Sequence, residues 1–114
     1  MGFKGFPKQG LDFLVALREN NTREWFNANK QTYKTQLQEP TLAFIDEVGE
    51  RLQKISPHIR YDLSTNGSGS LMRINRDTRF SKDKTPYKDR IAFMFWEGDG
   101  KKTQEPGFGM QIES

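Results

Sequence analysis

Cysteine is absent from the 114 residues, and histidine occurs once. Without cysteine the chain has no disulfide scaffold, thiolate zinc site or cysteine nucleophile, and one histidine is too few for a histidine-based zinc site. No apolar run approaches the roughly 20 residues that a membrane helix needs. The first ten residues, MGFKGFPKQG, also lack the apolar core of a secretory signal peptide. These absences favour a cytoplasmic protein without a membrane partner.

Apolar residues are scarce as well. Hydrophobic side chains make up 33% of the chain, although nine Phe and two Trp are among them. The core must therefore be thin and built largely from aromatic rings. The length suits one domain, because domains span about 50–250 residues. We expect residues 1–114 to form a single loop-rich domain or part of a larger one.

Positive charge is concentrated in one segment. The net charge is +3, yet residues 71–90 contain seven Arg and Lys against three Asp, a charge of +4. The remainder of the chain therefore carries −1. A local excess of this kind says more about partners than the overall isoelectric point does.

The first half of the chain has helical periodicity. In the run LDFLVAL, which follows Pro7, the Leu residues recur at helical spacing, and proline suits the start of a helix. This first helix is predicted to end at Asn20-Asn21. The whole of residues 8–55 is expected to be helical apart from such breaks.

Further helices are predicted downstream. Asn21 can cap a second helix, with Glu24 completing a capping box. Pro40 is expected to end or kink that helix. The run LAFIDEVGERLQKI then continues at helical spacing over residues 42–55 and is closed by a Ser-Pro pair. Gly49 costs about 1 kcal/mol within a helix, which indicates close packing there.

The second half changes to strand periodicity, and residues 70–113 are predicted to be β-rich. Residues 71–76 alternate as a strand, 81–87 read as a loop, and 90–96 form an apolar strand. Residues 97–102 are typical of a hairpin turn, and 107–112 follow as a third strand.

Helices followed by strands favour an α+β fold in which N-terminal helices pack on an antiparallel sheet. The chain ends at Ser114, inside or just after a strand. We therefore expect it to be the incomplete half of a larger single domain. An uncovered sheet edge would also favour a homodimer.

The strongest chemical signal is the segment RINRDTRFSKDKTPY, residues 73–87. Guanidinium groups recur there at three-residue spacing, and their planar donor forks match phosphates and carboxylates. Nearby Asp side chains can orient the forks, act as a base, or hold Mg²⁺ beside a phosphate. The candidate ligand-binding residues are Arg73, Arg76, Asp77, Arg79, Lys82, Asp83, Lys84 and Tyr87.

This segment resembles the signature RxxRDxRF followed by [D/N]KxxY of a conserved hypothetical family, domain of unknown function 2461. The N-terminal run NNTREWF, with a later Tyr33 and Pro40, is similar to the family's opening helices. The resemblance implies that the chain matches the N-terminal half of a longer family domain found in bacteria and fungi. It implies no activity, cofactor or catalytic residue.

Three functions stay open. A phosphate-bearing small molecule fits best, because the basic residues are compact in the sequence. Nucleic-acid binding is the alternative, since basic residues near aromatics can follow a backbone and stack bases. The third interpretation is an ion-pair network that only holds the loop to the sheet. The residues do not indicate whether the protein is an enzyme or which cofactor it would use.

Other candidates are weaker. His58 lies alone between predicted elements, and no Gly-x-Ser-x-Gly motif accompanies it to support a catalytic triad. Trp25, Phe26 and Tyr33 recur at helical spacing, which is typical of core packing.

Overall fold

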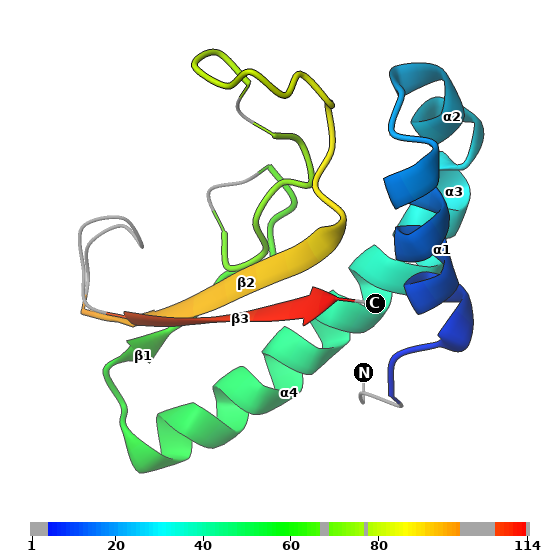
Figure 1. Ribbon diagram of the computed structural model, residues 1–114. Helices are drawn as coiled ribbons and strands as arrows, with labels where there is room; N and C mark the ends of the chain where they lie inside the picture. Colours follow the sequence, from blue (N-terminus) through cyan, green and yellow to red (C-terminus); the bar gives the residue numbers. More distant parts are fainter. Residues whose placement is uncertain (1–4, 67–68, 77, 99–106, 114) are drawn as a thin grey trace.

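The computed structural model describes residues 5–66, 69–76, 78–98 and 107–113. Helices occupy the first half, and an antiparallel sheet of three strands is built mainly by the second half (Figure 1). The first three helices gather at one end of the sheet, and the long fourth helix runs along one of its faces (Figure 1). The predicted α+β class is confirmed.

The first helix matches its prediction, and the second differs from it in its cap and in its length. The second was expected to run on to Pro40, but it ends at Ala28, before a turn at Asn29. α1 (Lys8–Glu19) starts directly after Pro7 and ends before Asn20, as predicted. α2 (Arg23–Ala28) is capped by Thr22, whose hydroxyl accepts a hydrogen bond from the Trp25 N–H at 3.2 Å. The capping box expected at Asn21 is therefore wrong, because the Asn21 side chain is engaged with a distant segment.

The next helical elements run without a break in the chain. α3 (Lys30–Tyr33) leads into a π-helical turn, η1 (Lys34–Gln38), and then into α4 (Glu39–Ile55). Pro40 lies in the first turn of α4, where its missing N–H is tolerated. The helix therefore does not end at Pro40, and the interruption takes the form of the π-helical turn before it.

α4 packs closely against the sheet and the segment that follows it. The rings of Phe44 and Phe93 lie 5.6 Å apart in an edge-to-face arrangement. Gly49 is buried, and a Cβ at this position would overlap the Tyr61 ring. The close packing predicted from Gly49 is confirmed.

The strands are ordered β1-β2-β3. β2 (Arg90–Glu97) and β3 (Gly107–Glu113) confirm the two predicted strands, and they pair antiparallel. β1 (Ile59–Arg60) was not predicted, because two residues are too few to show an alternation. Of the predicted turn at 97–102, residues 99–102 lie outside the described part of the chain.

The strand predicted over residues 71–76 is wrong. The structure has only two isolated bridges there, Leu71 to Phe93 and Asn75 to Tyr87. Between these two bridges the chain advances four residues from Leu71 to Asn75 but six residues from Tyr87 to Phe93. A continuous ladder of paired residues therefore cannot form. The two extra residues fall within 88–92, whose ends are held by hydrogen bonds from the Lys88 N–H to the Ile74 carbonyl and from the Met72 N–H to the Ala92 carbonyl.

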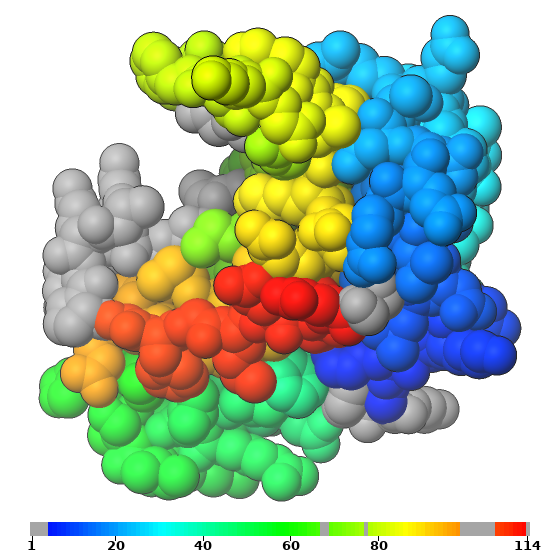
Figure 2. Space-filling view, viewed as in Figure 1, coloured from blue at the N-terminus to red at the C-terminus, as the bar shows by residue number. Residues whose placement is uncertain are grey.

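The core is aromatic, as the composition indicates. Phe93 and Phe95 of β2 are almost fully buried, and Phe26 and Tyr33 are buried beside Phe13, with Trp25 packed against them. The core role predicted for these helical aromatics is confirmed. By contrast, β3 lies at the surface in the space-filling view (Figure 2), where Phe108 is 45% exposed. None of the described helices combines the length and apolar content that crossing a membrane requires.

Candidate functional site

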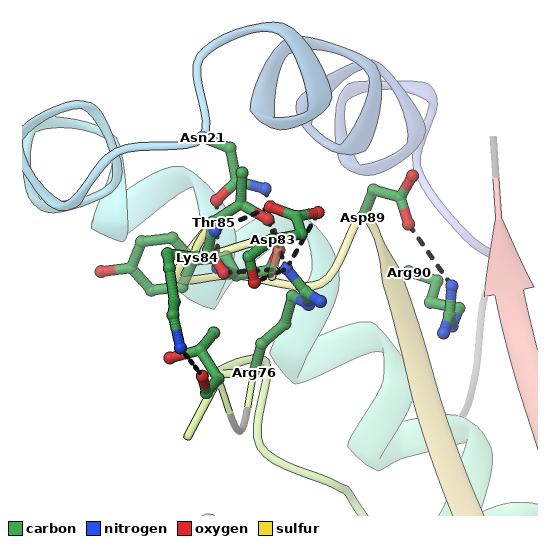
Figure 3. A network of polar contacts seen from close by, with 9 residues as sticks. Asn21, Arg76, Asp83, Lys84, Thr85, Asp89 and Arg90 are labelled. Carbon is green, nitrogen blue, oxygen red and sulfur yellow. Dashed lines mark hydrogen bonds and ion pairs between the residues drawn. The ribbon is translucent and has the colours of Figure 1, made fainter. Parts of the chain in front are cut away.

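A surface cavity of about 360 Å³ lies where the basic segment meets the helical end of the sheet. We call it the first cavity. It is lined from three directions: α1 and the turn after it, the loop of residues 76–87, and the start of β2. The lining residues are Arg18, Asn21, Arg76, Asp83, Thr85, Tyr87, Lys88, Asp89 and Arg90. Figure 3 shows several of them side by side.

Tyr87 anchors the loop to the helices. The Asn21 amide oxygen accepts from the Tyr87 N–H at 3.0 Å, and the Asn21 amide nitrogen donates to the Tyr87 carbonyl at 2.8 Å. The Tyr87 ring is buried and stacks on Phe26, with ring centroids 4.2 Å apart and planes 16° from parallel. Tyr87 was predicted to offer a hydroxyl or a ring to a ligand, and one face of its ring stacks on Phe26 inside the protein.

Arg76 ties the two ends of the 76–87 loop together. Its Nη1 donates to the Thr85 carbonyl at 3.1 Å and lies 3.2 Å from the Asp83 carboxylate (Figure 3). The Arg76 N–H also donates to the Pro86 carbonyl at 2.9 Å. The Arg76 side chain is 26% exposed, and its Nη1 is the atom that these contacts engage in the loop.

The carboxylate of Asp83 is stabilised by its immediate neighbours. The Thr85 N–H donates to it at 3.0 Å, the Thr85 hydroxyl adds a second hydrogen bond, and Arg76 supplies positive charge. Together these interactions hold the Asp83 pKa below its ordinary value. Asp83 is therefore ionised at neutral pH, which suits orientation of Arg76 and not acceptance of a proton.

Lys88 and Asp89 line the opposite side of the first cavity. The Lys88 ammonium donates to the Arg73 carbonyl at 2.9 Å, and its pKa is lowered by burial and by the nearby charge of Arg90. Asp89 lies between two arginines, 3.2 Å from Arg18 and 3.6 Å from Arg90. The described lining thus has four cationic side chains and two carboxylates, an excess of two positive charges.

The remaining predicted residues lie elsewhere. Arg73 lines a different cavity, described below. Arg79 lies over the ring of Phe80, 5.7 Å from its centroid, and Phe80 is 95% exposed. The Lys84 ammonium donates to the Thr78 carbonyl within the loop. Lys82 is exposed and lines neither cavity. The sequence-predicted set is therefore divided among separate surfaces.

Asp77 lies outside the described residues, so its predicted role as base or metal ligand is not placed. Within the part of the chain that the structure describes, no three His, Cys, Asp or Glu side chains gather where they could hold a metal ion.

Six cavity residues escaped the sequence prediction: Arg18, Asn21, Thr85, Lys88, Asp89 and Arg90. Lys88, Asp89 and Arg90 belong to the basic segment, and its charge count was the signal that could have included them. Arg18 and Asn21 come from the far end of the chain, 71 residues from Asp89 and 66 from Tyr87. Nothing in their local sequence marks them as part of a site.

The fold and the cavity define a small α+β protein with a locally positive surface site. The chain belongs to the family described as conserved hypothetical protein (DUF2461), whose family model matches residues 9–114. This confirms the family that the resemblance indicated. No curated protein and no solved structure matches the chain.

Proposed function

We propose that the first cavity binds a compact, phosphate-bearing anion. The observation that carries this proposal is the charge imbalance. Among the described residues, the cavity is lined by four cations, Arg18, Arg76, Lys88 and Arg90, and by two carboxylates. Lys88 is destabilised as a cation by burial and by Arg90. A bound anion would relieve that destabilisation, because an opposite charge nearby favours the charged form.

The size of the cavity supports a small ligand. About 360 Å³ lies near the lower end of small-molecule sites, which span about 300–1,000 Å³. Arg90 and Arg18 can present planar donor forks to phosphate oxygens, and Lys88 can add a point charge. The proposal rests on a compact group of cations. A long nucleic acid would instead require a broad basic stripe.

Titration with pyrophosphate tests it. Calorimetry on the unmodified chain and on Arg90→Gln should give a dissociation constant about tenfold larger for the variant, since one charge-assisted hydrogen bond contributes about 1.5–3 kcal/mol. Arg51→Gln is the matched control, because Arg51 is also exposed and has an ion pair of 3.5 Å, on α4. Equal affinities for the two variants would overturn the proposal.

Titration with a short single-stranded oligonucleotide distinguishes nucleic-acid binding from binding of a small anion. Its affinity would fall steeply with salt, because binding would release several counterions from the phosphates. Tighter binding of the oligonucleotide than of pyrophosphate, with that salt dependence, would favour the nucleic-acid function.

The structural interpretation of the motif has support at Arg76. Its contacts with Asp83 and Thr85 are internal to the loop. Arg76→Gln should therefore lower the melting temperature, whereas Arg79→Gln, on the exposed part of the loop, should change it little. A network role at Arg76 is compatible with anion binding by the other three cations.

A further inference from the structure

A second cavity, of about 310 Å³, lies between the helices and residues 71–75. Tyr87 lines both this second cavity and the first. The two cavities are otherwise lined by different residues. The second is bounded by α2, α3 and η1 on one side, and on the other by the stretch that was predicted to be a strand.

The floor of the second cavity is aromatic and apolar. Phe26 and Tyr33 have ring centroids 5.4 Å apart, and Phe26 stacks on Tyr87. Leu71 and Met72 extend this floor. Burial raises the pKa of Tyr33 to about 12, so its phenol stays protonated at neutral pH. The floor can therefore contact an apolar ligand body and carries no negative charge.

The rim of the second cavity carries positive charge only. Lys30 and Lys34 lie one helical turn apart, and Arg73 lines the cavity from the facing segment. All three side chains are exposed, and among the described residues none of them is in an ion pair. The described lining includes no carboxylate, in contrast to the first cavity.

Cations over an apolar aromatic floor match a ligand with two parts. We infer that the second cavity binds a small aromatic anion, with the ring on the Phe26, Tyr33 and Tyr87 floor and the anionic group at Lys30, Lys34 and Arg73. The rim recognises charge and the floor recognises the ring, so neither inorganic phosphate nor a neutral aromatic would satisfy both. This site does not depend on anion binding in the first cavity.

Phenyl phosphate is the probe, and amide NMR shift mapping is the measurement. Phenyl phosphate should shift the amides of residues 30–34 and 71–75 and bind at least tenfold more tightly than methyl phosphate, which lacks the ring. Benzyl alcohol, which lacks the charge, should cause no saturable shift. Equal affinity for phenyl and methyl phosphate would overturn the inference, as would shifts confined to residues 88–90.

Two charge-removing variants test the rim. Lys34→Gln and Arg73→Gln should each weaken phenyl phosphate binding about fivefold or more. Lys54→Gln is the matched control, because Lys54 is an exposed lysine in the last turn of α4. Arg90→Gln should leave the phenyl phosphate shifts of residues 30–34 and 71–75 unchanged, even where it weakens binding in the first cavity, so the two cavities can fail separately. Equal losses in Lys54→Gln and Lys34→Gln would contradict the inference.

Discussion

The side chain of Asn21 pairs with the backbone of Tyr87 as a neighbouring strand would. Its amide accepts from the Tyr87 N–H at 3.0 Å and donates to the Tyr87 carbonyl at 2.8 Å. One amide side chain thereby satisfies both main-chain groups of a residue 66 positions away. This pair joins the helical half of the chain to the basic loop, and Tyr87 sits between the two cavities.

Replacing Asn21 by Ala should destabilise the protein by about 2 kcal/mol. The substitution leaves the N–H and carbonyl of Tyr87 without their partner, and a buried unsatisfied group costs about 1–3 kcal/mol. Urea unfolding followed by fluorescence measures the loss. Asn27→Ala, at an exposed position of α2, is the control and should cost less than about 0.5 kcal/mol. Equal midpoints for the two variants would contradict the role of the pair.

Gly49→Ala should be destabilising although alanine is the better helix former. The added methyl would overlap the Tyr61 ring, and overpacking costs about 1–3 kcal/mol, against a helix-propensity gain of about 1 kcal/mol. Thermal unfolding of Gly49→Ala and of the exposed Glu50→Ala gives the comparison. In a Tyr61→Ala background the Gly49→Ala substitution should become stabilising. A stabilising effect in the unmodified chain would show that the ring moves aside freely.

Asp83 should contribute to stability in a pH-dependent way. Its pKa in the folded protein is lowered, by hydrogen bonds from Thr85 and by Arg76. The stabilisation is therefore fully present above the ordinary value of 3.8 and is lost as the pH falls towards the lower, folded-state pKa. Denaturation at pH 7 and at pH 3 should show Asp83→Asn less stable than the unmodified chain at pH 7, with a smaller difference at pH 3. A difference that does not change with pH would exclude this linkage.

Lys88 reports on the charge in the first cavity. Burial and Arg90 lower its pKa below 10.5, so the folded state releases this proton before the unfolded state does. The unfolded state binds more protons between the two values, and stability contributed by this group therefore rises with pH in that interval. NMR titration of the Lys88 side chain should show its pKa move upward on addition of pyrophosphate and in Arg90→Gln. An unchanged pKa with saturating pyrophosphate would place the anion elsewhere.

Periodic elements could be predicted from the sequence because their signals are local. The Leu spacing after Pro7 locates α1, and the apolar runs locate α4 and β2. The strand predicted at 71–76 was wrong for a reason that the local sequence does not show. Its buried residues, Leu71 and Ile74, lie three positions apart and not two, and the partner segment is two residues too long to keep the ladder.

The candidate site was predicted only in part, and long-range packing explains why. Arg76 and Asp83 do line the first cavity together. Arg73, only three residues before Arg76, lines the second cavity, and side chains three residues apart in an extended chain point to opposite sides. Arg18 enters through a contact with Asp89 across 71 residues. Spacing in the sequence could locate the basic segment but could not show which side chains share a surface.

The π-helical turn η1 also determines how tolerant the chain is of a change in length. Each α-helical residue advances about 100° around the axis, and a π-helical turn accommodates an extra residue within a helix. Deleting one residue from Lys34–Gln38 would restore the α-helical repeat and leave the faces of α3 and α4 nearly as they are, because the wider turn holds the extra residue. Tyr33 would then stay in the core, and Lys30 would stay at the rim of the second cavity. A one-residue deletion in the middle of α4 would instead rotate the residues after it by about 100°. We expect the melting temperature to fall less for the deletion in η1 than for the deletion in α4. A stretch that reads in the sequence as ordinary polar helix is thus where the loss of one residue is most acceptable.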